Sequence, residues 1–193
     1  MRNRVSGPWV MLLASMLLAA CGGGDGGGPP GPPDMTAISG DSKLMTLTPS
    51  QAAQVCDDVE DYQTFNISPR DVCKLSGVAS ALLLAMIDPT FTDVELRDAC
   101  ALGVDQCIAY PTDPTGKCPL GVPSTCTPTP TVNDLLKCVR DDVAAANAAL
   151  AAVPACTAVT RTWLLANGAN AGQFDTPASC VALAAECPDI LAR

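Results

Sequence analysis

Apolar residues recur at steps of three and four along much of the chain after residue 48. In one segment these residues are Val72, Leu75, Ala79, Leu82 and Met86. In a later segment they are Leu136, Val139, Val143, Ala146, Leu150 and Val153. Such spacing places apolar side chains on one face of an α-helix, as a buried seam. No stretch shows sustained alternation of apolar and polar residues, so we predict an all-α fold with essentially no sheet.

Ser or Thr precedes five helical segments at the N-cap position, where its side chain accepts a hydrogen bond from the first turn. These residues are Thr48, Ser68, Thr92, Thr131 and Thr176. Gln51 and Glu95 complete capping boxes with the Thr three residues earlier. We therefore predict a bundle of about five helices, near residues 49–64, 69–87, 93–108, 132–153 and 177–187.

Residues 109–131 break the helical pattern. Six prolines and two glycines fall in this stretch, which predicts a long irregular connector between two groups of helices. A shorter extra helix is expected within residues 158–174. Together these segments predict a single helical domain over residues 48–193.

The first 20 residues are typical of an export signal. Arg2 and Arg4 precede an apolar stretch of 12 residues at positions 9–20. A membrane-spanning helix needs about 20 apolar residues, so this stretch is a signal h-region and not a span. We predict that residues 1–20 are a signal peptide.

The signal ends on Leu18-Ala19-Ala20-Cys21, which resembles the lipobox of bacterial lipoproteins. The resemblance implies cleavage between Ala20 and Cys21 and lipidation of Cys21. Residues 22–34 consist almost entirely of Gly and Pro. We predict that residues 21–47 comprise the lipidated cysteine and a flexible tether.

The chain has 11 cysteines, and ten remain if Cys21 carries lipid. An even number is expected when the thiols of an exported domain pair as disulfides in an oxidising compartment. No two cysteines are spaced C-x-x-C and the chain has no histidine, so the pattern indicates neither a metal site nor a cofactor. Equal distances from the turn near residue 90 predict the bridge Cys73–Cys107. The other predicted bridges are Cys56–Cys100, Cys118–Cys126, Cys138–Cys187 and Cys156–Cys180.

The charge balance is acidic. Without Arg2 and Arg4, 9 basic and 20 acidic residues leave a net charge of −11. A chain without a basic stripe is a poor partner for nucleic acid. Anionic lipid would also repel it, so we expect membrane attachment only through the lipid on Cys21.

Few residues offer catalytic chemistry. Histidine is absent and complete pairing of the cysteines leaves no free thiol, so we predict no catalytic residue and no enzyme. Four carboxylates, Asp57, Asp58, Glu60 and Asp61, gather on the first helix. A solvated helix face is the favoured interpretation. The alternatives are a divalent-cation site or acid–base catalysis by an envelope hydrolase.

The whole chain resembles the uncharacterised cysteine-rich, all-helical lipoproteins of Gram-negative bacteria. The likeness rests on the lipobox, the Gly/Pro tether, the segment 132–138 and the segment 176–180. It implies an exported, membrane-tethered helical protein without an assigned activity. Gly22 after Cys21 implies transfer to the outer membrane, on either face. We expect a non-enzymatic interaction module for an envelope protein or glycan.

Overall fold

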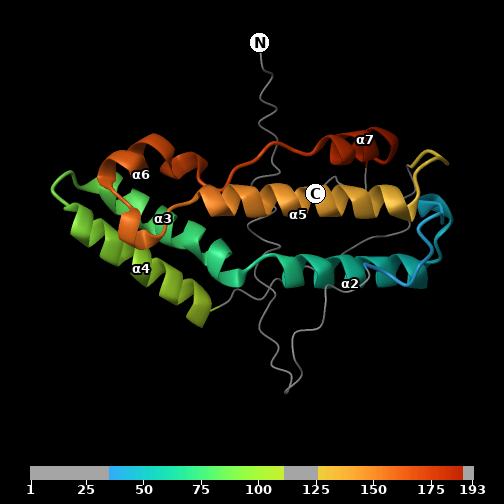
Figure 1. The fold of residues 1–193 in the computed structure, drawn as a ribbon, viewed down its shortest axis with the longest axis horizontal. Coiled ribbons are helices and arrows are strands. Elements are labelled where there is room, and N and C mark those ends of the chain that lie inside the picture. Colours follow the sequence, from blue (N-terminus) through green and yellow to red (C-terminus); the bar gives the residue numbers. More distant parts are fainter. Residues whose placement is uncertain (1–34, 111–125, 189–193) are drawn as a thin grey trace, which may run out of the picture. The chain divides into compact units, whose positions relative to one another are not determined.

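The computed structural model describes residues 35–110 and 126–188 (Figure 1). The α-helices of this part are α2 (Pro49–Asn66), α3 (Pro69–Ile87), α4 (Asp93–Ala109), α5 (Val132–Ala152), α6 (Arg161–Asn167) and α7 (Ala178–Glu186). Three 3-10 helices accompany them: η1 (Leu44–Thr46), η2 (Cys156–Ala158) and η3 (Gly168–Asn170). Within these residues there is no strand, only an isolated bridge between Lys43 and Thr131, so the all-α prediction is confirmed.

All five predicted helices are present, with ends within two residues of the predicted ones. The short helix expected within 158–174 is α6. The predicted signal peptide, Cys21, residues 22–34 of the tether and connector residues 111–125, with Cys118, lie outside the described residues. None of the described helices is long and apolar enough to cross a membrane.

Local capping explains where most helices begin. Thr92 and Glu95 form a reciprocal capping box at the start of α4. Thr48 and Gln51 exchange the same pair of hydrogen bonds before α2, with donor–acceptor distances of 3.0 and 3.3 Å. Each box satisfies backbone N–H groups that have no partner within the helix. α7 differs from the prediction, because its N-cap is Pro177 and no side chain caps it.

The chain divides into two compact units, whereas the sequence predicts one domain. The first unit holds η1, α2, the part of α5 up to Val143, and α7. The second holds α3, α4, the remainder of α5, η2, α6 and η3. Each unit therefore combines segments that are far apart in the sequence.

Residues 35–47 contribute three buried side chains to the first unit, so the prediction that they are part of a flexible tether is wrong. Leu44 is 1% exposed, and Met35 and Leu47 are also buried. The backbone N–H of Leu44 donates to Pro130 (3.0 Å), and the N–H of Val132 donates to Ser42 (2.9 Å). The Gly/Pro composition ends before these apolar residues, which bury themselves beside the start of α5.

The second unit is built around a cluster of buried apolar residues: Val78, Ala81, Ala85, Leu96, Cys100, Val153, Val159 and Leu164. α3 and α4 form an antiparallel pair at its centre. Gly77 and Gly103 allow their backbones to approach closely, since a Cβ on Gly77 would lie 2.5 Å from the carbonyl oxygen of Cys100. A Cβ on Gly103 would lie 2.9 Å from the Cα of Gly77.

The two predicted apolar seams have different outcomes. Every residue of the α5 seam is buried. In α3, Ala79 and Met86 are exposed, so that seam is partly wrong. The sequence of α3 is apolar on most sides, and the approach to α4 through Gly77 selects a different face for burial.

Four disulfides join described cysteines: Cys73–Cys107, Cys100–Cys156, Cys126–Cys187 and Cys138–Cys180. The first agrees with the predicted bridge between antiparallel helices. Cys56 is also disulfide-bonded, and its partner lies outside the described residues. The disulfides indicate an oxidising, exported location.

The other four predicted bridges are wrong. Cys56–Cys100 fails because these two cysteines belong to different compact units, and η2 brings Cys156 to α4. With Cys156 bonded there, the predicted Cys156–Cys180 bridge cannot form.

The predictions for the last helix fail because the segment before α5 packs against the end of α7. The backbone N–H of Thr127 donates to Glu186 (2.8 Å), so Cys126 lies at the C-terminal end of α7 and bonds to Cys187. This pairing overturns both Cys118–Cys126 and Cys138–Cys187. Cys138 bonds instead to Cys180 in the first turn of α7.

Candidate functional site

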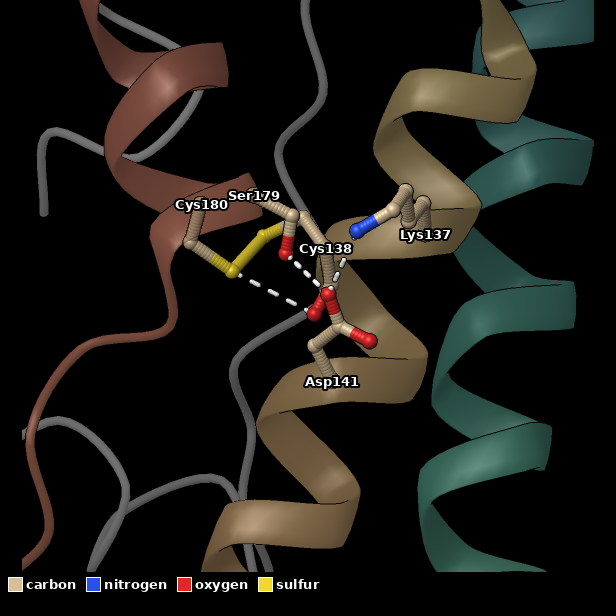
Figure 2. The surroundings of a disulfide bond; sticks show 5 residues. All are labelled: Lys137, Cys138, Asp141, Ser179 and Cys180. Atoms are coloured by element: carbon tan, nitrogen blue, oxygen red, sulfur yellow. Dashed lines mark hydrogen bonds and ion pairs between the residues drawn. A yellow bond between two sulfur atoms is a disulfide. The ribbon is translucent and has the colours of Figure 1, made fainter.

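One cluster of polar side chains surrounds the Cys138–Cys180 disulfide in the first unit (Figure 2). Lys137 and Asp141 lie one turn apart on α5, and Ser179 comes from α7. Ser179 Oγ donates to Asp141 Oδ2 at 2.5 Å, and Lys137 Nζ donates to the same oxygen at 2.9 Å. The cluster therefore joins α7 to α5 beside a covalent bond.

The charges in this cluster are better suited to holding α7 against α5 than to catalysis. The hydrogen bond from Ser179, followed by that from Lys137, lowers the pKa of Asp141 below its usual value. A carboxylate with a lowered pKa stays ionised at neutral pH and is a poor base for removing a proton from Ser179. The arrangement orients α7 on α5 and does not activate the serine.

The disulfide itself is shielded in this cluster. Cys138 and Cys180 are 3% and 4% exposed. The sulfur of Cys180 lies 3.2 Å from the carbonyl oxygen of Cys138, a close contact and not a hydrogen bond, because a disulfide sulfur carries no proton. The bridge is thus a buried structural link.

The acidic cluster predicted on the first helix lies on α2. Asp57 and Asp61 are exposed, whereas Asp58 and Glu60 are half-buried. Asp58 Oδ2 is buried without a hydrogen-bond partner in the described structure. Within residues 35–110 and 126–188, no three cysteine or carboxylate side chains gather closely enough to hold a metal ion.

A second candidate site is a stripe of exposed apolar side chains on α3. Leu83, Met86 and Ile87 are 59%, 68% and 68% exposed, and their spacing places them on one face of the helix. α3 packs against α4 and α6, and these three side chains remain exposed beside those contacts. We call these three residues the α3 stripe.

Two carboxylates that are close enough to influence each other follow the C-terminal end of α3. Asp88 follows Ile87 directly, and Glu95 lies in the first turn of α4. Hydrogen bonds from Thr90 lower the pKa of Asp88, and hydrogen bonds from Thr92 lower the pKa of Glu95. Both groups are therefore ionised at neutral pH, and Asp88 gives the stripe an acidic edge next to Ile87, although the Arg161 cation also acts on Asp88.

A partly buried cation stabilises the same end of α3. The guanidinium of Arg161 donates to the carbonyl oxygens of Ala85, Asp88 (3.1 Å) and Phe91 (3.2 Å). These carbonyls terminate α3 and the turn after it, where a positive charge is favourable. Arg161 thus holds the turn that carries Asp88.

The sequence did not lead us to predict the hydrogen bonds of Asp141 with Lys137 and Ser179, or those of Arg161 with the end of α3. The contact between Lys137 and Asp141 could have been predicted from their spacing, because side chains four residues apart meet on a helix. Ser179 and Arg161 gave no such signal, because Asp141 lies 38 residues from Ser179 and the carbonyl partners of Arg161 lie 70 to 76 residues from it. The α3 stripe was hidden inside a helix that is apolar on most sides.

Comparison of the chain with protein-family models, with curated proteins and with solved structures found no match.

Proposed function

We propose that this chain is an exported, lipid-anchored protein of a bacterial envelope and that its helical part is a non-enzymatic interaction module. The module docks through the α3 stripe. The observation that carries this proposal is the exposure of Leu83, Met86 and Ile87 on one face of a helix packed elsewhere. Gathered apolar side chains on a surface are typical of protein interaction sites.

The partner we infer is a protein segment with apolar side chains at its centre and Lys or Arg at its edge. Apolar residues would cover the stripe, and cations would pair with ionised Asp88 and Glu95. An anionic lipid surface does not fit, because the chain without Arg2 and Arg4 has 9 basic and 20 acidic residues and a formal net charge of −11. A glycan fits less well, since aliphatic side chains give its hydroxyl groups no hydrogen-bond partners.

The expected affinity of the stripe by itself is low. These three side chains are about two-thirds exposed, so burying this exposed surface contributes roughly 3–6 kcal/mol. Association costs an estimated 4–15 kcal/mol, so most of this gain is offset. Confinement to a membrane raises the effective concentration of the module, which makes weak docking productive. This argument connects the interaction surface to the anchor.

The anchor is supported by the sequence and by the disulfides. The segment 18–21 resembles a lipobox, and the disulfides indicate an oxidising compartment. Gly22 after Cys21 favours the outer membrane of a Gram-negative cell.

Docking is tested with a photo-crosslinking residue at position 83 of the full chain in its native cells. The crosslinked protein is identified by mass spectrometry, and its affinity for purified variants is then measured. Met86→Glu should weaken binding about tenfold or more, because it removes a buried side chain and adds a charge. Leu165→Glu, at a residue of α6 that is 57% exposed, should leave affinity within about twofold.

The proposal fails if position 83 crosslinks only to lipid or to nothing. It also fails if Leu165→Glu weakens binding as much as Met86→Glu, since the stripe would then have no special role. Raised salt should weaken binding moderately if the acidic edge pairs with cations.

The alternative is a carboxylate-dependent hydrolase or divalent-cation protein acting through Asp57, Asp58, Glu60 and Asp61. The buried Asp58 Oδ2 without a hydrogen-bond partner favours it, but among the described residues no three cysteine or carboxylate side chains gather closely enough to hold a metal ion. Replacing all four by Ala and heating with and without calcium tests this alternative. Calcium-dependent stabilisation of the unmodified chain that the variant lacks would establish a cation site.

A further inference from the structure

All four disulfides between described cysteines skip at least one cysteine in the sequence. Cys73–Cys107 passes over Cys100, and Cys100–Cys156 passes over Cys107, so these two bridges interleave. Cys138–Cys180 passes over Cys156 and is nested inside the bridge from Cys126. Pairing in order along the chain would therefore give none of these bridges.

Two native helices each carry cysteines seven residues apart. Cys100 and Cys107 both lie in α4, and Cys180 lies in α7 with Cys187 at its C-cap. Seven residues of helix rise about 10.5 Å. A disulfide needs Cα atoms about 4.4–6.8 Å apart. A bond within either pair is therefore incompatible with its helix.

In the unfolded protein, however, short loop length favours the non-native bonds Cys100–Cys107 and Cys180–Cys187. The chance of contact falls roughly as the −3/2 power of the loop length. The native partner of Cys100 is 56 residues away, eight times farther than Cys107, so the wrong contact is favoured about 20-fold. For Cys180 the native partner is 42 residues away, and the wrong contact with Cys187 is favoured about 15-fold.

Early formation of α4 and α7 prevents these two non-native bonds only in part. Helices form in microseconds, whereas disulfides form in seconds to hours. However, isolated helices shorter than about 12–15 residues are marginal in water. α7 has nine residues, and α4 has 17 but gains its stability from packing on α3. Both helices therefore open often enough before packing for the wrong bonds to form.

We infer that maturation of this chain depends on a thiol–disulfide exchange catalyst, a partner that presents a reduced thiol of low pKa. Its thiolate attacks one sulfur of the Cys100–Cys107 bond and forms a mixed disulfide, and the other cysteine leaves as a thiolate. That thiolate attacks a second non-native disulfide of the chain and releases one of its cysteines as a thiolate. The released thiolate attacks the mixed disulfide, forms a bond within the chain and releases the catalyst thiolate. Each step breaks one S–S bond and forms one, so the exchange involves no net oxidation.

The test starts from the full chain, unfolded and reduced, and allows it to reoxidise. One sample receives an oxidant alone, a second a mixture of reduced and oxidised glutathione, and a third a reduced thiol–disulfide isomerase. Samples are quenched over time, and their disulfides are mapped on unreduced peptides. With oxidant alone, Cys100–Cys107 and Cys180–Cys187 should dominate and persist. A thiol catalyst should raise the yield of Cys100–Cys156 about tenfold or more.

The second and third samples distinguish a small thiol from an enzyme as the source of the exchange. The inference is overturned if oxidant alone forms the native bridges as fast and as completely as either catalyst. It is also overturned if the earliest bonds show no excess of Cys100–Cys107 over Cys100–Cys156. This early measurement does not require the chain to fold.

A variant supplies an internal control. Replacing both Cys73 and Cys107 by Ser removes the wrong partner in α4 and keeps the wrong pair in α7. The dependence of Cys100–Cys156 on a thiol catalyst should then fall about fourfold, because the nearest remaining wrong partner, Cys118, is 18 residues away and not seven, whereas Cys180–Cys187 should still accumulate. Equal dependence of Cys100–Cys156 on the catalyst in the variant and the unmodified chain would contradict the inference.

Discussion

At the residue scale, the chemistry of a carboxylate here depends on the donors around it. The side chain of Asp141 is 42% exposed, and two hydrogen-bond donors nonetheless keep it ionised. Asp142, the next residue, has a raised pKa because burial penalises its charge. Adjacent carboxylates on one helix thus have opposite shifts, and residue type by itself predicts neither.

Asp141 gives a pH-dependent prediction. Because its pKa is lower in the folded chain than the usual value of 3.8, it contributes stability above that value and loses it as pH falls through the folded pKa. Asp141→Asn should therefore lower the melting temperature at pH 7, and the difference should shrink below about pH 4.

Thermal unfolding of the oxidised protein across this pH range measures the effect. Asp105→Asn, at an exposed carboxylate of α4, is the control and should have little effect at any pH. An Asp141→Asn effect of the same size at pH 3 and pH 7 would show that ionisation has no part in holding α7.

At the element scale, replacing Gly77 by Ala has two opposing effects on the free energy of unfolding. Replacing a mid-helix Gly by Ala normally stabilises a helix by about 0.5–1 kcal/mol. At Gly77 the added Cβ would lie 2.5 Å from a backbone oxygen of α4, and overpacking costs about 1–3 kcal/mol. We expect the steric cost to prevail, so Gly77→Ala should lower the free energy of unfolding.

Denaturant unfolding of the oxidised protein measures this difference. The matched control is Ala79→Gly on the exposed side of α3, which should cost about 0.5–1 kcal/mol from helix propensity. A stabilised Gly77→Ala protein would mean that α3 and α4 can separate without loss.

Helix ends were predictable because they depend on local chemistry. Thr92 and Glu95 are three residues apart, and their reciprocal hydrogen bonds form within one turn. The buried face of α3 was not predictable in the same way. Leu82 and Met86 are equally apolar, and only the placement of α4 and α6 leaves Met86 exposed.

At the scale of the whole molecule, cysteine parity connects the disulfides to the anchor. Cys56 is disulfide-bonded, and the other eight described cysteines pair with one another. The two cysteines of the chain outside the described residues are Cys21 and Cys118. If Cys21 carries lipid, the partner of Cys56 is Cys118.

This argument gives a prediction for the mature protein. Mapping of unreduced peptides should find Cys56 bonded to Cys118 and a lipid on the N-terminal cysteine. Cys21→Ser should abolish incorporation of labelled fatty acid and release the protein from membranes. A Cys21–Cys56 bond, or membrane attachment that survives Cys21→Ser, would contradict the lipid anchor.

The sequence by itself determined the helices, their caps and the need for an oxidising compartment, because these follow from neighbouring residues and from composition. It also contains the lipobox-like segment on which the proposed anchor rests. Only the tertiary structure decided which cysteines meet, that Met35, Leu44 and Leu47 are buried and which face of α3 remains exposed. These features depend on contacts between segments distant in sequence, such as Leu44 with Pro130 and Cys100 with Cys156. Helical spacing limits which side chains share a face, but packing selects the face that is buried.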